Sequence, residues 1–99
     1  MLCALTIRRL KPGVFDDFRA AFMRYVGDDS PDGWTQFDMV RGTRNPDEIV
    51  CFGFFDGTID ELRANAAEGG YAEQQEQIAV FVDAVVVDDL FEVIEHTTV

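Results

Sequence analysis

The chain has 99 residues, and its 19 acidic side chains against eight basic ones give a formal net charge of −11 at pH 7. This length suits one domain, placed here over residues 1–99, whose core can remove about 65% of the unfolded surface from water. The negative charge argues against nucleic acid as a partner, because the protein surface and the phosphates would repel each other.

A membrane location is also not expected. Arg8 and Arg9 interrupt the N-terminal stretch where a signal peptide would need an apolar segment. No apolar run approaches the ~18 residues of a membrane-spanning helix. We therefore expect a cytoplasmic protein with no membrane partner. Cys3 and Cys51 lack the C-x-x-C spacing of redox and zinc sites, so they are interpreted as small buried hydrophobic residues.

The apolar content predicts a homodimer. Apolar residues make up 47% of the chain and include nine Phe, more than one layer between a sheet and two helices can hide. A second copy of the chain is the simplest cover for the excess. The acidic residues, of which residues 56–99 carry eleven against Arg63 alone, then serve to keep an apolar oligomer dissolved.

The first strand is predicted over Leu2 to Leu10. Its alternation places two sets of side chains on opposite faces, namely Cys3, Leu5 and Ile7 against Leu2, Ala4, Thr6 and Arg8. Both faces are apolar near its start, which is typical of a central strand. Lys11-Pro12-Gly13 ends the strand, and Pro12 is placed in the first turn of the next helix, where its missing N–H costs nothing.

The next segment is predicted to be a helix that Gly27 terminates. Its apolar residues recur every three or four positions, at Phe15, Phe18, Phe22 and Val26. This spacing predicts one buried stripe. Asp16 and Asp17 near the start and Arg24 near the end suit the helix dipole.

Two strands follow a loop over residues 28–33. Trp34 to Arg41 alternates polar and apolar residues and is predicted to be a half-exposed edge strand. Asn45-Pro46-Asp47 is a turn sequence. Ile49 to Phe55 has large apolar side chains on both faces, so both of its faces must be covered.

The rest of the chain is predicted to be largely helical. Thr58 and Glu61 form a possible capping box, and Gly69-Gly70 interrupts the helix. Tyr71 to about Val86 is ambiguous, because its first half favours a helix whereas its second half is rich in β-branched residues. We predict a helix here, since a second covering helix is needed, and a last strand over Leu90 to Glu95.

This order, βαββαβ, predicts an α+β ferredoxin-like sandwich with a four-stranded antiparallel sheet. The sequence then resembles the dimeric α/β-barrel superfamily, and within it the antibiotic biosynthesis monooxygenase-like domains. The segments that carry the resemblance are Leu10-Lys11-Pro12-Gly13, Asp32-Gly33, Asn45-Pro46-Asp47 before Ile49 to Asp56, and Leu90 to Glu95. The resemblance implies a homodimer whose two sheets press together into a barrel.

The chain departs from the family at two polar positions. Many members have a Trp late in the third strand and a His in the second helical region, where this chain has Gly53-Phe54-Phe55 and Gly69-Gly70-Tyr71. Haem-degrading relatives use an Asn on the first strand, and Leu2 to Leu10 contains none. Haem degradation is therefore not expected. No metal is expected either, because the single His, His96, has no further ligands at a suitable spacing, and no cofactor is predicted. The resemblance implies instead an oxygenase without metal or flavin, which lets an electron-rich aromatic anion meet oxygen in an apolar pocket.

Three residues are predicted to be catalytic, each with a plainer alternative. Trp34 could place its indole N–H against a substrate oxygen, or it could be a packing lid. Tyr71, where relatives have His, could donate a proton to a phenol or accept one from it. Arg41 could pair with a substrate phenolate, or with Asp38 or Asp47 in a surface ion pair.

Four further residues are predicted to line a substrate pocket: Gly53, Tyr25, Asn65 and Phe22. Gly53 leaves room in a strand of large Phe residues for a bulge, a packed ring or a ligand. Asn65 could orient a carbonyl, or it could be an ordinary exposed helical Asn. Tyr25 could simply cover the core with its ring.

Two functions follow from these observations. One is a cofactor-independent monooxygenase that acts on an aromatic or polyketide-like molecule in a cleft between sheet and helices. The alternative is a non-catalytic homodimer that binds a small apolar molecule or supports a pathway or a stress response. An open cavity near Gly53, Tyr71 and Trp34 would favour the enzyme, whereas a space filled by Phe side chains would favour the alternative.

Overall fold

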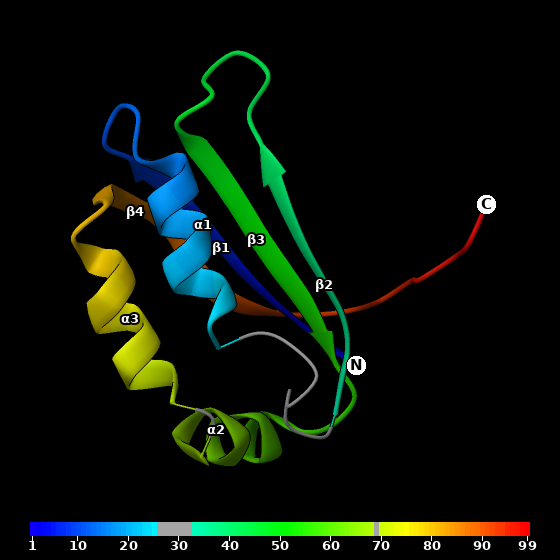
Figure 1. The fold of residues 1–99 in the computed structure, drawn as a ribbon. Coiled ribbons are helices and arrows are strands. Elements are labelled where there is room, and N and C mark those ends of the chain that lie inside the picture. The colour runs from blue at the N-terminus through cyan, green and yellow to red at the C-terminus, as the bar shows by residue number, and fades with distance from the viewer. Residues whose placement is uncertain (26–32, 69) are drawn as a thin grey trace.

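A computed structural model describes residues 1–25, 33–68 and 70–99 of the chain. The elements follow the order β1 (Leu2–Leu10), α1 (Phe15–Met23), β2 (Trp34–Arg41), β3 (Glu48–Phe55), α2 (Ile59–Glu68), α3 (Tyr71–Ala79) and β4 (Val82–Glu92) (Figure 1). The predicted α+β ferredoxin-like fold is confirmed.

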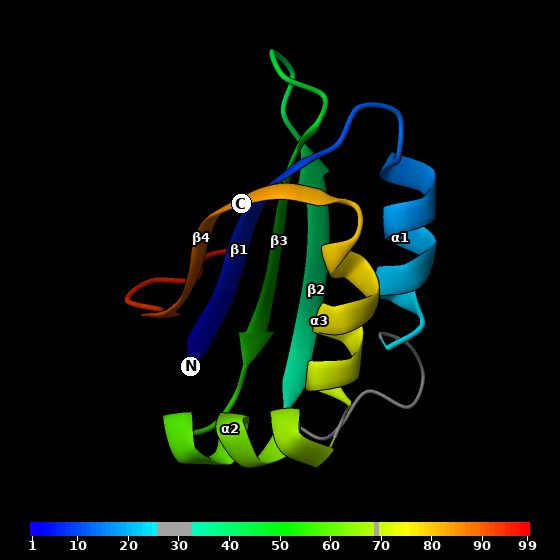
Figure 2. The same cartoon turned by 90° about the vertical axis from the view of Figure 1, so that its left-hand side faces the viewer.

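The four strands form one antiparallel sheet in the order β2-β3-β1-β4. The predictions that β1 is central and that β2 lies at an edge are therefore confirmed. Figure 2 shows α1 and α3 on one side of the sheet and α2 across its end. The opposite face of the sheet is left without a helix among the described elements.

The register of β1 decides which of its side chains meet the helices. Thr6 is opposite Cys51 and Arg8 is opposite Ile49, and both partners on β3 are buried on the helix-covered face. The core on this face consists of Leu10, Phe18, Ala21, Phe22, Ile49, Cys51 and Ile78. Because side chains alternate along a strand, Ile7 and Arg9 point to the opposite face.

The structure corrects the prediction of a helix up to Val86. The helix α3 ends at Ala79, and β4 begins at Val82 rather than at Leu90 and ends at Glu92. The β-branched run belongs to the strand, because it continues the pairing with β1 as far as Leu10 opposite Val82. The requirement for a covering helix is met by the shorter Tyr71–Ala79 segment.

The start of α1 also differs from the prediction. The helix begins at Phe15, so Pro12 lies in the preceding turn and not in the first helical turn. The reason is Gly13, whose φ of 78° is left-handed and cannot continue a right-handed helix. The predicted helix residues Val26 and Gly27, the loop over residues 28–32 and Gly69 lie outside the described residues.

The predicted capping box at the start of α2 is confirmed. The backbone N–H of Glu61 donates to Thr58 Oγ1 at 3.1 Å, and the backbone N–H of Thr58 donates to Glu61 Oε1 at 3.3 Å. These two bonds satisfy donors that a helix start otherwise leaves unpaired. They hold the helix that closes one end of the molecule.

We expect Thr58→Ala to lower the free energy of unfolding by about 1 kcal/mol, because it removes the capping oxygen. Urea denaturation with and without the substitution measures this loss. Thr43→Ala, in the exposed turn between β2 and β3, is the matched control and should change stability little. Equal effects of the two substitutions would show that the capping box does not stabilise the fold.

Candidate active site

A cavity of about 650 Å³ lies between the helix-covered face of the sheet and the helices. Its walls come from all four strands and from all three helices, and apolar atoms predominate. This volume lies within the range that small-molecule sites commonly have, and a few converging polar groups in an apolar wall are typical of such sites. The Phe side chains of the core therefore leave space beside them.

Small residues at the centre of the sheet make part of this space. Gly53 on β3 is opposite Ala4 on β1, and both line the cavity. A Cβ atom at Gly53 would lie 2.9 Å from Cζ3 of Trp34. Gly53 therefore allows the indole ring to lie directly against the strand, which combines two of the alternatives weighed for this residue, a packed ring and a wall of the pocket.

Trp34 reaches the cavity because β2 is irregular at its start. Trp34 is opposite Phe55, but Gln36 is opposite Phe54, so the register shifts between Trp34 and Gln36. The extra residue places both Trp34 and Phe37 on the cavity side, where strict alternation would have separated them. The indole ring also meets the Phe55 ring edge-on, with centroids 5.3 Å apart.

The indole N–H of Trp34 already has a partner. It donates to Asn65 Oδ1 at 3.0 Å, which ties β2 to α2 across the cavity wall. Asn65 is thus half-buried and bonded, not an exposed helical residue. A bound molecule would meet the ring of Trp34 unless it displaced Asn65 from the N–H.

Tyr71, the first residue of α3, lines the cavity and stays partly exposed. Burial raises the pKa of its phenol above the ordinary value of 10.0, and the Asp88 carboxylate raises it further, whereas the Arg8 guanidinium opposes both effects. The phenol therefore stays protonated at neutral pH. In this state it can donate a hydrogen bond, but it does not act as a base.

Arg8 is a cavity residue that the sequence analysis missed. It is only 3% exposed, and it lines the cavity. Its Nη1 donates to Thr6 Oγ1 at 2.8 Å, its Nη2 donates to Gln75 Oε1 at 3.4 Å, and the guanidinium carbon lies 5.7 Å from the centre of the Phe22 ring. A signal was present, because a central strand with both faces covered must bury one of two consecutive arginines.

The cavity brings together six of the seven residues singled out from the sequence. Those that line it are Phe22, Tyr25, Trp34, Gly53, Asn65 and Tyr71. Arg41 does not: its guanidinium carbon lies 4.0 Å from the centre of the Phe15 ring, and it forms no ion pair with Asp38 or Asp47, which the structure also describes. The catalytic and binding roles of these residues stay predictions.

Both cysteines are free, as the sequence predicts. Cys51 is buried at the base of the cavity, and burial raises the pKa of its thiol more strongly than Arg8 and Thr6 lower it. Burial also raises the pKa of Cys3. Both thiols therefore stay protonated at neutral pH. Cys51 packs as a small buried apolar group, as predicted, whereas the prediction that Cys3 is buried is wrong, because Cys3 is only partly buried. Among the described residues, no group of three or more His, Cys, Asp or Glu side chains could hold a metal ion.

The fold and the cavity together define an α+β protein with a mainly apolar cavity between sheet and helices. Solved structures share this architecture over nearly the whole chain. A candidate antibiotic biosynthesis monooxygenase from Chloroflexus aurantiacus J-10-fl superposes with a TM-score of 0.79 at 13% identity, covering 98% of this chain and 96% of that one.

Two further structures extend the comparison. SnoaB from Streptomyces nogalater, a cofactor-independent oxygenase solved as a point mutant, gives a TM-score of 0.79 at 15% identity over 96% of this chain and 94% of its own. Rv0793 from Mycobacterium tuberculosis also gives 0.79, at 13% identity, over 98% of both chains. The chain therefore has the fold of antibiotic biosynthesis monooxygenase-like proteins.

Comparisons of sequence give no assignment: no family model and no curated protein matches the chain. None of the described helices has the length and apolar character needed to cross a membrane.

We expect Tyr71 to titrate late. Ultraviolet difference absorbance of the folded protein should show a phenol that ionises above pH 10.0, and Tyr71→Phe should remove this component whereas Tyr25→Phe should retain it. Because the folded-state pKa is the higher one, the stability that Tyr71 contributes is complete below pH 10.0 and is lost as pH rises further. A late component that survives Tyr71→Phe would contradict this assignment.

Proposed function

We propose that the protein is a cofactor-independent oxygenase that acts on an aromatic or polyketide-like small molecule in the cavity between sheet and helices. The observation that carries this proposal is the cavity itself, which is open, mainly apolar and lined by Trp34, Tyr71 and a buried cationic side chain. The shared fold with a cofactor-independent oxygenase supports it as an analogy only, because one fold hosts many activities.

The cavity suits chemistry in which the substrate supplies the electrons. A phenol-activated ring carbon that loses a proton becomes a carbanion or enolate, and this anion can reduce molecular oxygen. For a ring methylene the step balances, since one oxygen atom stays on carbon as a carbonyl and the other leaves as water with the two methylene hydrogens. The protein then has to bind the anion, orient the ring and exclude bulk water.

Individual side chains divide these tasks. Trp34, Phe22 and Phe37 offer aromatic surface to a planar substrate. Tyr71, whose phenol stays protonated, can donate a hydrogen bond to the developing anionic oxygen or peroxide. Exposed Asp88, at the cavity and close enough to Tyr71 to raise its pKa, is the carboxylate best placed to accept the substrate proton.

Binding without turnover is the second candidate function, and one feature of the cavity favours it. Two of its polar side chains are already satisfied within the protein: the Trp34 indole donates to Asn65, and Gln74 Nε2 donates to the backbone carbonyl of Phe22 at 3.1 Å. Because these polar side chains already have hydrogen-bond partners, the cavity wall suits binding of an apolar molecule as well as it suits catalysis.

Oxygen consumption separates the two functions. We expect the purified protein, with no added metal or flavin, to accelerate oxygen uptake in the presence of a hydroquinone or anthrone. Trp34→Phe and Tyr71→Phe should each lower the rate about tenfold, a loss of about 1.4 kcal/mol of transition-state stabilisation. The control is Arg19→Gln, on an exposed position of α1, which should leave the rate unchanged.

Two results would contradict the oxygenase. Folded protein that binds the aromatic compound but gives no oxygen uptake above the uncatalysed rate would establish binding without turnover. A rate that neither Trp34→Phe nor Tyr71→Phe reduces would place the reaction elsewhere than in this cavity.

We also infer that the helix-free face of the sheet is covered by a second copy of the chain. This face carries apolar residues on three neighbouring strands and one charged residue, Asp89, opposite Leu5 on the edge strand β4. The apolar residues are Leu5, Ile7, Val50, Phe52, Phe54, Val87 and Phe91. The edge residue Phe91 is 45% exposed in the single chain. An apolar face of this kind, centred on two adjacent strands, has the composition of a buried layer between sheets.

Light scattering tests the dimer. The protein should have about twice the 11.1 kDa mass of one chain. Ile7→Glu, at the centre of the helix-free face, should give the mass of one chain, because it places an unpaired charge in the interface. Val80→Glu, at a position 62% exposed after α3, is the matched control and should stay dimeric. A monomeric parent protein would refute the dimer without affecting the oxygenase proposal.

A further inference from the structure

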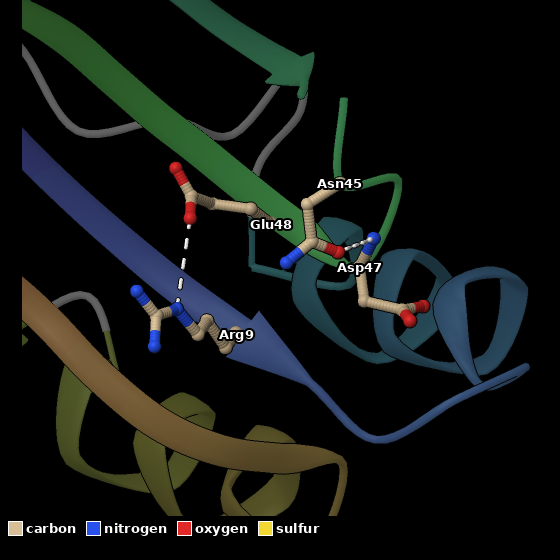
Figure 3. Close-up of polar contacts among 4 residues, drawn as sticks. All are labelled: Arg9, Asn45, Asp47 and Glu48. Carbon is tan, nitrogen blue, oxygen red and sulfur yellow. Dashed lines mark hydrogen bonds and ion pairs between the residues drawn. The ribbon is translucent and has the colours of Figure 1, made fainter. Parts of the chain in front are cut away.

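Arg8 and Arg9 are adjacent in sequence and opposite in environment. Arg9 points away from the helices, and its Nε lies 3.6 Å from Glu48 Oε2, with both side chains partly exposed (Figure 3). Arg8 points into the cavity and is 3% exposed. No carboxylate of residues 1–25, 33–68 and 70–99 lies within ion-pair distance of its guanidinium.

The contacts of Arg8 are with neutral groups. The partners that the structure gives it are the hydroxyl of Thr6, the side-chain carbonyl of Gln75, the face of Phe22 and the Cys51 thiol, whose pKa burial keeps above its ordinary value despite Arg8. Removing a guanidinium from water costs several kcal/mol, and neutral hydrogen bonds recover only part of that cost. A buried cation that has no carboxylate partner in the described part of the chain is therefore a site where an anion would bind favourably.

The charges around the cavity restrict that anion further. Asp88 also lines the cavity and is exposed, whereas Asp89, opposite Leu5, points to the helix-free face of the sheet. Asp88 lies on β4 opposite Thr6 of β1, so it is on the same face of the sheet as Arg8. The buried Arg8 guanidinium and the exposed Asp88 carboxylate favour a ligand with one negative charge directed toward Arg8, and they disfavour a second negative charge directed toward Asp88.

The geometry points to Arg8 as the residue that selects the ligand: the cavity takes a planar aromatic molecule with a single oxyanion, which pairs with the Arg8 guanidinium. The oxyanion is a phenolate, an enolate or a carboxylate conjugated to the ring. This inference rests on the proposed function and narrows its substrate class. It also assigns Arg8 a chemical task there, because a guanidinium that stabilises the ionised substrate raises the fraction in the form that reacts with oxygen.

Matched ligands test the charge preference without requiring turnover. The probes are 2-naphthoate and 2-naphthamide, which have the same ring and nearly the same shape but differ by one negative charge. Calorimetry gives their dissociation constants, and quenching of Trp34, the only Trp of the chain and a residue of the cavity wall, reports that the ligand occupies this site. We expect the unchanged protein to bind 2-naphthoate at least tenfold more tightly than 2-naphthamide.

Substitution of Arg8 should remove this preference. Arg8→Gln should weaken 2-naphthoate at least tenfold and change 2-naphthamide less than threefold. Arg9→Gln is the matched control, since it removes the neighbouring charge on the opposite face, and it should preserve the preference. If Arg8→Gln does not fold, Gln75→Glu makes the same test, because it places a carboxylate at the position that now accepts from Arg8 Nη2 and so neutralises the cation in place.

The pKa of bound 2-naphthol shows whether the site prefers a phenolate or a carboxylate. A bound naphthol that ionises below its pKa in water, in the parent protein but not in Arg8→Gln, assigns the site to phenolates. A naphthol pKa that does not change, together with a preference for naphthoate, assigns it to carboxylates. Either result supports the pairing with Arg8.

The inference is overturned if the two naphthalene ligands bind equally to the parent protein, or if the preference survives both Arg8→Gln and Gln75→Glu. These results are distinguishable from a failure of the proposed function. A preference for 2-naphthoate without oxygen uptake would support the anion site and contradict the oxygenase. Oxygen uptake without that preference would support the oxygenase and contradict the anion site.

Discussion

The pairing of β1 with strands on both of its sides is the constraint on which the rest of the structure depends. A strand between two neighbours cannot rotate, so each of its side chains is assigned to one face of the sheet. Ala4, Thr6 and Arg8 are directed toward the helices, and Ile7 and Arg9 are directed away from them. A slip of one residue would exchange these two sets, placing Ile7 and Arg9 against the helices and removing the cation from the cavity.

The aromatic part of the cavity wall depends on a second local feature, the irregular start of β2. The extra residue before Gln36 turns Trp34 toward the cavity, and Gly53 on the neighbouring strand leaves the indole ring the space it needs. The bond from Trp34 to Asn65 then connects this edge of the sheet to α2, which the Thr58–Glu61 capping box begins. The aromatic wall is therefore held from two elements, which favours a preformed pocket.

Much of the fold could be predicted from sequence, because strand alternation, turn residues and a capping box are local signals. The edge position of β2, the central position of β1 and the interruption near Gly70 are of this kind. The β-branched run after Ile78 was assigned wrongly, since helical spacing and strand propensity coincide there. Only pairing with β1, a contact distant in sequence, decides between them.

The residues of the cavity could be predicted less completely than the fold. Gly53 could be singled out as a small residue among Phe side chains, Trp34 and Asn65 for the hydrogen bonds that they can make, and Tyr71 because relatives have His at that position. The structure places all four on the cavity wall. Arg8 could not be separated from Arg9 by residue type, since the difference lies in the face of the sheet that each one occupies. Arg41 was predicted to be catalytic, but it does not line the cavity. Its guanidinium lies over the Phe15 ring, a contact that its position at a strand end does not reveal.

Burial of Arg8 joins stability and function in one residue. The desolvated guanidinium opposes folding of the empty protein, and an anionic ligand that binds only the folded state would offset that cost in proportion to its affinity. A purely structural role would be served better by an apolar side chain, as at Leu10 two residues further on the same face. The position of the charge is therefore better explained by what the cavity binds than by what the core requires.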